Sequence, residues 1–173
     1  DFTFANLENS DFELSDISRA NFTAAELHGS YLHRVKAPKT IFRNAVLTES
    51  DLSYSNFENS DFEFVSMHGS KLDHSNFSGS NFYRSDLHGA NLKFSNLSNS
   101  LLIGADFRNA DLEGVNFSNS DLTHSNFDGA NLRDAILENV NADNMRLCEA
   151  ILPDGTLTPS CKKRKKSFTN ADR

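Results

Sequence analysis

The chain has 173 residues, of which 24 are acidic and 17 are basic, so its formal net charge is −7. This acidic balance argues against direct nucleic-acid binding over the body of the protein, because such binding relies on basic side chains. No run of 18 apolar residues occurs in the sequence, which excludes a predicted membrane-spanning helix. The length predicts one domain with a short tail.

A five-residue repeat organises the chain from Phe2 to Leu152 without an insertion. Leu, Phe, Ile or Met fills 29 of the 31 positions 2, 7, 12 and onward, and Ala or Ser fills 24 of the 30 positions 5, 10, 15 and onward. This period matches neither an α-helix nor the alternation of a long strand. The large and small positions are two apart, so both are predicted to point inward, with one turn per pentad. Asp or Asn precedes the apolar residue in 20 of 31 pentads, and both residues favour turns.

A longer period of 20 residues is superimposed on the pentads, because S-N-F occurs at 55–57 and again at 75–77, and S-N-L at 95–97. Four pentads per coil predict a square cross-section in which residue i stacks on residue i+20. Over residues 1–152 the pattern resembles the pentapeptide-repeat family, whose signature is A-(D/N)-L-X-X. The resemblance implies an all-β fold, a right-handed quadrilateral parallel β-helix of about seven to eight coils. The stacking predicts interior columns such as Phe2, Phe22, Phe42, Phe62 and Phe82.

In chain order, residues 1–35 and 42–140 keep the repeat well, whereas residues 36–41 are a weak corner. There Ala37 takes the apolar position and Pro38 removes a backbone donor, so a bulged corner that stays in register is expected. The repeat weakens after residue 141, and L-P-D-G-T at 152–156 predicts a turn that closes the last coil. Residues 153–173 are therefore expected to form a C-terminal cap turn followed by a basic, disordered tail.

The basic tail contains five consecutive cations: Lys162, Lys163, Arg164, Lys165 and Lys166. Such a run could bind nucleic acid, anionic lipid or an import receptor, or could simply keep the protein soluble. Cys148 and Cys161 flank the expected cap. A disulfide between them would staple the cap and point to an oxidising, secreted or lumenal compartment, while free thiols fit the cytoplasm, which is slightly favoured. The chain begins in mid-repeat without Met, which predicts that upstream residues were removed or belong to another part of a longer protein.

No catalytic, cofactor-binding or metal-binding motif stands out from the repeat. His28, His68 and His88 share one outward column, but Thr48 and Arg108 interrupt it. Asp and Asn replace each other at the turn position. Because an amide could not replace a catalytic acid, this exchange indicates that most of these carboxylates are turn residues. The sequence thus predicts a protein that is not an enzyme and that needs no cofactor or metal.

Two surfaces are candidates for partner binding. Face one, meaning positions 1, 3 and 4 of each 20-residue coil, carries apolar residues where polar ones are expected: Phe64, Tyr83, Leu101 and Ile103. A contiguous exposed apolar patch suggests contact with a protein partner or a second copy, and scattered surface apolar residues are the alternative. The second surface is an acidic column that includes Asp86, Asp106 and Asp128.

Three functions are compatible with this sequence. The first is a rigid interaction scaffold for a protein partner. The second follows from the family resemblance, since some pentapeptide-repeat proteins are DNA mimics that bind type II topoisomerases such as gyrase and protect against quinolones. The third is a secreted or lumenal structural module of a longer protein. The position of the negative charge discriminates between the first two, and the sequence upstream of residue 1 would test the third.

Overall fold

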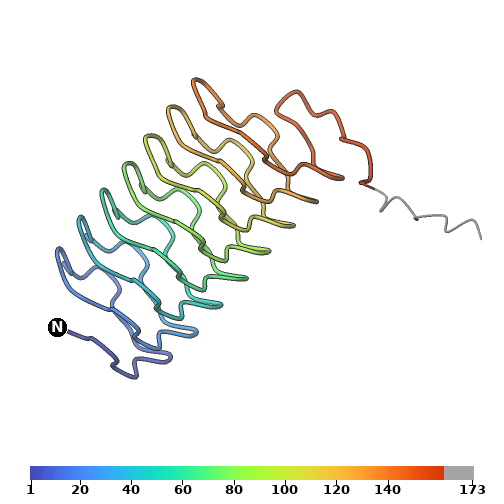
Figure 1. Cartoon of the computed structure of the whole chain (residues 1–173). Helices are drawn as coiled ribbons and strands as arrows, with labels where there is room; N and C mark the ends of the chain where they lie inside the picture. The colour runs from blue at the N-terminus through green and yellow to red at the C-terminus, as the bar shows by residue number, and fades with distance from the viewer. Residues whose placement is uncertain (162–173) are drawn as a thin grey trace, which may run out of the picture.

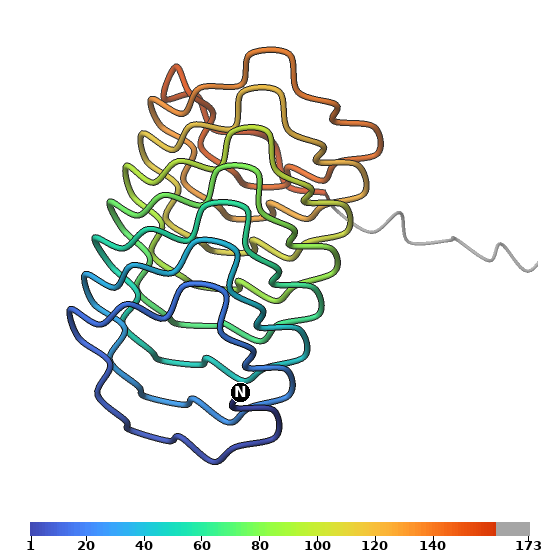
Figure 2. The ribbon, with the colours of Figure 1, turned by 90° about the vertical axis from the view of Figure 1, so that its left-hand side faces the viewer.

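Each pentad makes one side of a four-sided coil, and the coils stack into a rod. The computed structural model describes residues 1–161, and the two ends of this stretch lie at opposite ends of the rod (Figures 1 and 2). Among these residues there is no helix and no continuous strand. Instead, parallel bridges of single residues join neighbouring coils at a spacing of 20, from Asn6↔Glu26 to Asn131↔Ile151. This arrangement confirms the predicted quadrilateral parallel β-helix.

The turn at the end of each pentad explains why the repeat prefers Asn, Asp and Gly. In the first pentad the Ala5 N–H donates to the Phe2 carbonyl at 3.0 Å, and Phe4, the third residue of that turn, has a φ of 58°. Positive φ at this place is what type II turns require, and Gly and Asn adopt it most easily. The residue before the apolar position accepts a hydrogen bond from the second turn residue, as Asn56 Oδ1 does from the Glu58 N–H at 3.2 Å.

The interior consists of stacked columns of large apolar side chains, as predicted. Phe22 and Phe42 stack with ring centroids 5.0 Å apart, and Phe62 and Phe82 stack at 4.7 Å. Phe77 is fully buried and stacks on Phe57 at 5.2 Å. Each fully buried side chain contributes roughly 1.5–3 kcal/mol. Because every coil packs only on its neighbours, stability accumulates along the rod.

Buried serines connect successive coils through their hydroxyl groups. Ser60 donates from Oγ to the Ala37 carbonyl at 2.9 Å, and Ser80 donates to the Phe57 carbonyl at 2.9 Å. In each case the acceptor is 23 residues earlier and is the carbonyl that also closes the turn below. The small position is therefore also polar, because its hydroxyl needs a partner in the interior.

The corner at residues 36–41 forms an ordinary turn, so the expected bulge is absent. Ala37 is buried in the apolar position, and the Thr40 N–H donates to the Ala37 carbonyl at 3.4 Å. Pro38 stands second in this turn, where type II turns favour proline and where the ladder uses no backbone donor. The proline is thus accommodated without a shift in register, and the bridges continue from Lys36 to Asn56.

A short returning segment closes the C-terminal end of the described chain. Ile151 and Leu157 form an antiparallel bridge, and the Thr158 N–H donates to the Ala150 carbonyl at 2.8 Å. Cys148 and Cys161 are paired as a disulfide, with their Cα atoms 5.3 Å apart. The sequence left this pairing open, and the fold decides it because the return brings residue 161 beside the last coil.

Candidate interaction surfaces

The outward residues of the rod fall on four faces, because each pentad is one side of the coil. Face one is defined above. Face two takes positions 6, 8 and 9 of each coil, face three takes 11, 13 and 14, and face four takes 16, 18 and 19. Faces one and three are on opposite sides of the rod, as are faces two and four.

On face one the structure places the predicted apolar residues on neighbouring coils, partly exposed. Phe64 is 44 % and Leu101 39 % exposed, whereas Tyr83 and Ile103 are half-buried. The Phe64 and Tyr83 rings pack edge to face with centroids 5.6 Å apart. Together they form an apolar patch flanked by charged side chains.

The charged groups beside the patch are largely paired. The Arg43 guanidinium lies 2.9 Å from Asp61 and 2.7 Å from Glu63, and the hydrogen bond to Asp61 raises the pKa of Arg43. The Arg84 guanidinium sits 5.3 Å from the centroid of the Tyr83 ring. An occupant of face one would therefore meet apolar surface at the centre and paired charges around it, the usual arrangement of an interface.

Face two holds the predicted acidic column, but arginines neutralise much of it. Asp86 and Asp106 are bridge neighbours. Arg108 forms a bidentate pair with Asp106, with its Nη2 2.6 Å from Oδ2. Partial burial raises the pKa of Asp106, but the hydrogen bonds from Arg108 outweigh this and the net pKa is lowered. Asp128 pairs with Arg146 at 2.5 Å.

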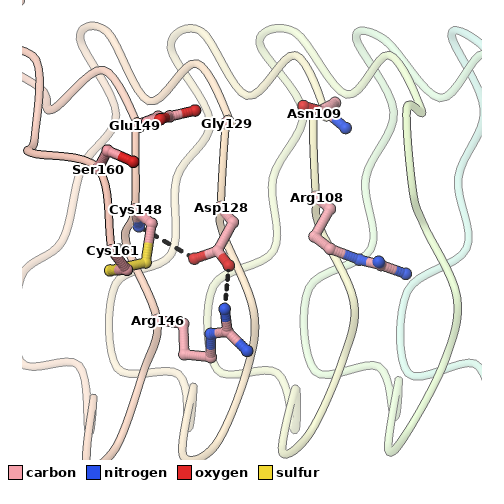
Figure 3. Close-up of a pocket in the computed structure, with 9 residues that line it drawn as sticks. All are labelled: Arg108, Asn109, Asp128, Gly129, Arg146, Cys148, Glu149, Ser160 and Cys161. Carbon is pink, nitrogen blue, oxygen red and sulfur yellow. Dashed lines mark hydrogen bonds and ion pairs between the residues drawn. A yellow bond between two sulfur atoms is a disulfide. The ribbon is translucent and has the colours of Figure 1, made fainter. Parts of the chain in front are cut away.

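A shallow pocket of about 270 Å³ opens on face two beside the disulfide. Figure 3 shows the Asp128 carboxylate between the Cys148 backbone N–H and the Arg146 guanidinium, with Arg108 pointing away from them. The pocket is lined by Arg108, Asn109, Asp128, Gly129, Arg146, Cys148, Glu149, Ser160 and Cys161. Both of its arginines are already paired with aspartates, so the pocket offers no free cation to an anionic ligand.

Face four carries the expected ladder of amides and hydroxyls. The Asn76 amide donates to Asn56 Oδ1 at 3.2 Å, and the Asn96 amide donates to Asn76 Oδ1 at 3.3 Å. These bonds run along the rod axis and use the polar groups within the molecule. Part of the polar surface of face four is therefore used in hydrogen bonds within the rod.

Face three carries an aromatic ladder that sequence reasoning missed. Tyr54 stacks on His74 with centroids 4.8 Å apart, His74 stacks on Phe94 at 5.3 Å, and His33 meets Tyr54 edge to face at 5.6 Å. Tyr54 and Phe94 remain 53 % and 52 % exposed. The sequence does carry a signal for this ladder, because three aromatic residues stand 20 positions apart at residues 54, 74 and 94.

The three residues of this ladder adopt an energetically unfavourable backbone conformation. Tyr54, His74 and Phe94 have φ values of 58°, 57° and 56°. Left-handed backbone costs roughly 1–2 kcal/mol for a residue with a side chain, whereas glycine escapes this cost. An aromatic pair contributes only about 0.5–1.5 kcal/mol beyond its burial. The ladder thus adds little net stability and leaves half of its surface in contact with solvent.

Two family profiles match the chain. One, described as pentapeptide repeats in eight copies, matches residues 1–34 and 40–79, and the other, described as a pentapeptide repeat region, matches residues 60–135. The chain belongs to the pentapeptide-repeat family.

Solved structures of this family share the fold. A trypsin-treated form of QnrB1, a plasmid-mediated fluoroquinolone resistance protein, is 19 % identical, and the match has a TM-score of 0.74 over 90 % of this chain and 78 % of QnrB1. Rfr23, a pentapeptide repeat protein from the cyanobacterium Cyanothece 51142, is 25 % identical, with a TM-score of 0.57 over 70 % of this chain and 90 % of Rfr23. A search of curated proteins finds no match. These likenesses establish a pentapeptide-repeat scaffold and leave its partner open.

The remaining features singled out by the sequence are the histidine column and the basic tail. Within residues 1–161, no group of three or more His, Cys, Asp or Glu side chains is arranged to hold a metal ion, and no helix is long and apolar enough to cross a bilayer. The His28 Nδ1 lies 2.7 Å from Thr48 Oγ1. The basic run Lys162–Lys166 lies outside the described residues.

Proposed function

We propose that this chain is a non-enzymatic, rigid scaffold that binds a protein partner through face one. The observation that carries the proposal is the apolar patch of Phe64, Tyr83, Leu101 and Ile103, whose exposed members lie on a surface that the repeat would otherwise make polar. The backbone ladder holds these side chains on consecutive coils, so little conformational entropy is lost when a partner binds. A partner with a complementary apolar surface is favoured.

Replacing Leu101 and Ile103 by lysine should abolish partner binding while the rod stays folded. The charges would have to be desolvated beneath the partner, which is strongly unfavourable. Binding would be followed by comparing the proteins captured by the immobilised wild-type and variant chains, with circular dichroism as the folding check.

A matched control is Ile136→Lys with Glu138→Gln on face four, which makes the same change in net charge at equivalent positions. Ile136 is exposed by 42 %, similar to Leu101. Equal capture by all three proteins would remove face one as the binding surface.

The second candidate function is mimicry of DNA toward a type II topoisomerase, which the charge arrangement supports poorly. Residues 1–159 carry 23 acidic and 11 basic side chains, a net charge of −12. The rod is ~37 Å long at ~4.8 Å per coil, and B-DNA of that length holds roughly 22 negative charges. In addition, Asp106 and Asp128 of the acidic column are paired with arginines. The density of negative charge that the rod presents to a DNA-binding channel is therefore about half that of the duplex.

We therefore expect no effect on gyrase. A supercoiling assay with and without a quinolone tests this, using the wild-type chain and a variant with Asp86, Asp106 and Asp128 changed to Asn. Inhibition or quinolone protection by sub-micromolar wild-type protein, lost in the variant, would reverse the ranking of the two functions.

A further inference from the structure

The returning segment, residues 152–161, takes the hydrogen-bonding place of a further coil at the end of the rod. One coil earlier, the Gly129 N–H donates to the Cys148 carbonyl at 2.8 Å, and the Ala130 carbonyl accepts from the Ile151 N–H at 2.9 Å. On the last coil the equivalent groups belong to Glu149 and Ala150. The Glu149 N–H donates to the Pro159 carbonyl at 3.3 Å, and the Ala150 carbonyl accepts from the Thr158 N–H at 2.8 Å. The segment therefore covers an edge that would otherwise be free to pair.

The segment packs little of its own surface against the rod. Leu157 forms the bridge to Ile151 but is 68 % exposed, and residues 154–156 and 159–161 are exposed as well. Burial of apolar surface, the main stabilising contribution in the interior of the rod, is thus small here. Closure depends on hydrogen bonds and on the disulfide.

Thr158 makes most of the hydrogen bonds between the segment and the last coil. Besides the bond from its N–H, its Oγ1 accepts from the Ala150 N–H at 2.8 Å and donates to the Leu147 carbonyl. Each bond of this kind contributes a small net free energy, whereas ordering several residues of backbone is costly. The hydrogen bonds alone therefore hold the segment weakly, and the disulfide keeps it closed.

The disulfide is more accessible at Cys161 than at Cys148. Cys148 lies on the last coil and is only 9 % exposed, whereas Cys161 is exposed at the end of the segment. Both cysteines line the shallow pocket on face two, which opens to solvent (Figure 3). Exposed disulfides are typically the exchangeable ones, because a thiolate can reach them without unfolding the protein.

We propose that this disulfide is a redox switch that a protein dithiol opens while the rod stays folded. A thiolate of the dithiol attacks Cys161 Sγ and forms a mixed disulfide with it, and the bond to Cys148 Sγ breaks. Cys148 leaves as a thiolate and takes a proton from water. The second thiolate of the dithiol then attacks its own sulfur in the mixed disulfide, so that Cys161 leaves as a thiolate and is protonated in turn. Two electrons pass to the two cysteines, and the dithiol becomes a disulfide.

Reduction changes the surface at this end of the rod. When the segment leaves, the Glu149 N–H and the Ala150 carbonyl lose their partners and become part of a free strand edge. Such an edge can pair with another extended chain, whereas the closed form covers it. The change stays local because each coil contacts only its neighbours. The switch rests on the C-terminal cap alone and is independent of the partner proposed for face one.

The first test is reduction of the folded wild type by dithiothreitol, followed by alkylation of the free thiols and mass spectrometry. The rate should rise in proportion to the dithiothreitol concentration, and the β spectrum in circular dichroism should persist throughout. A rate that levels off at high dithiothreitol would show that the protein has to unfold before it is attacked. That result would overturn the proposal.

The site of attack is tested with a thioredoxin-type protein whose resolving cysteine is replaced by serine, so that the mixed disulfide is trapped. Peptide mapping should find this protein joined to Cys161. Absence of a trapped complex, or a link to Cys148, would contradict the proposed path.

Opening is measured by amide exchange in NMR spectra of the oxidised and reduced wild type. The N–H groups of Glu149 and Thr158 should exchange about 100-fold faster after reduction, because their acceptors belong to the contact that is lost. The matched control is the Gly69 N–H, which occupies the position of Glu149 in the middle of the rod and donates to the His88 carbonyl at 3.0 Å. Its exchange should not change. Unchanged exchange at Glu149 and Thr158 would show that reduction does not open the segment.

A pair of threonine variants tests what holds the closed form. Thr158→Val removes the hydroxyl that bonds to the last coil and should shift the equilibrium with dithiothreitol toward the reduced protein by about fivefold. Thr156→Val is the matched control, because the Thr156 hydroxyl bonds to Asp154 within the segment at 2.7 Å. It should keep the wild-type equilibrium. Equal equilibria for the two variants would contradict the assigned role of Thr158 and with it the proposed closed state.

Discussion

Replacing Phe77 by aspartate is expected to unfold the rod. Phe77 has no exposed surface, stacks on Phe57 with centroids 5.2 Å apart, and meets Phe62 and Phe82 edge to face at 5.6 and 5.5 Å. Loss of a buried Phe costs about 3–5 kcal/mol. The aspartate would also place an unpaired charge among apolar rings, which adds several kcal/mol. The sum is comparable to the whole stability of a typical domain, about 5–15 kcal/mol.

The measurement is thermal unfolding followed by circular dichroism. Phe64→Asp is the matched control, because Phe64 lies on the same coil but is 44 % exposed, and its variant should unfold close to the wild-type temperature. If Phe77→Asp kept both the β spectrum and the wild-type Tm, Phe77 would not be in the interior and the assigned register would be wrong.

The second large effect is expected at the C-terminal cap when its disulfide is removed. Cys148 and Cys161 are 13 residues apart in sequence. Closing a loop of this length stabilises a fold by about 3 kcal/mol on the chain-entropy account. The returning segment is otherwise held by hydrogen bonds to the last coil, such as those from the Thr158 N–H to the Ala150 carbonyl at 2.8 Å and from the Glu149 N–H to the Pro159 carbonyl at 3.3 Å.

Cys148→Ala with Cys161→Ala should therefore let the returning segment open while the middle of the rod stays closed. Hydrogen exchange followed by mass spectrometry should show faster exchange in residues 145–161 and unchanged exchange in residues 60–100, because each coil contacts only its neighbours. Treatment of the wild type with a reductant should reproduce the pattern. Exchange at the cap that is the same in oxidised, reduced and variant proteins would show that the disulfide contributes nothing there.

The architecture of this protein could be predicted from its sequence because the repeat is unbroken. Phe77 and Phe82 occupy the apolar position in phase with Phe2, so their burial follows from counting. The period of 20 residues likewise predicts that Asn56 and Asn76 are neighbours. Each pentad has the same preference for a turn and an inward side chain. The overall fold therefore follows from the repetition of one local geometry.

The tertiary structure decided what depends on contacts between coils. Proline in a repeat predicts a disruption, but Pro38 is the second residue of a turn and fits there. The small size of serine predicts an inward position, but the hydrogen bonds of Ser60 and Ser80 to carbonyls 23 residues earlier depend on the stacking of the coils. The disulfide between Cys148 and Cys161 depended on the path of the returning segment.

The aromatic ladder most clearly separates what the sequence predicts from what the packing between coils determines. Tyr54, His74 and Phe94 occupy a position that normally holds Asn or Gly, and their 20-residue spacing is visible in the sequence. Whether they point into solvent, stack on one another or cover a neighbouring coil depends on side-chain rotation about a left-handed backbone. The stacked coils decide it by placing the three rings in a column, with Phe94 close above Gly114, where an added Cβ would lie 2.5 Å from the Phe94 ring. Periodicity alone determines which residues share a column, and only the packing between coils determines what surface that column presents.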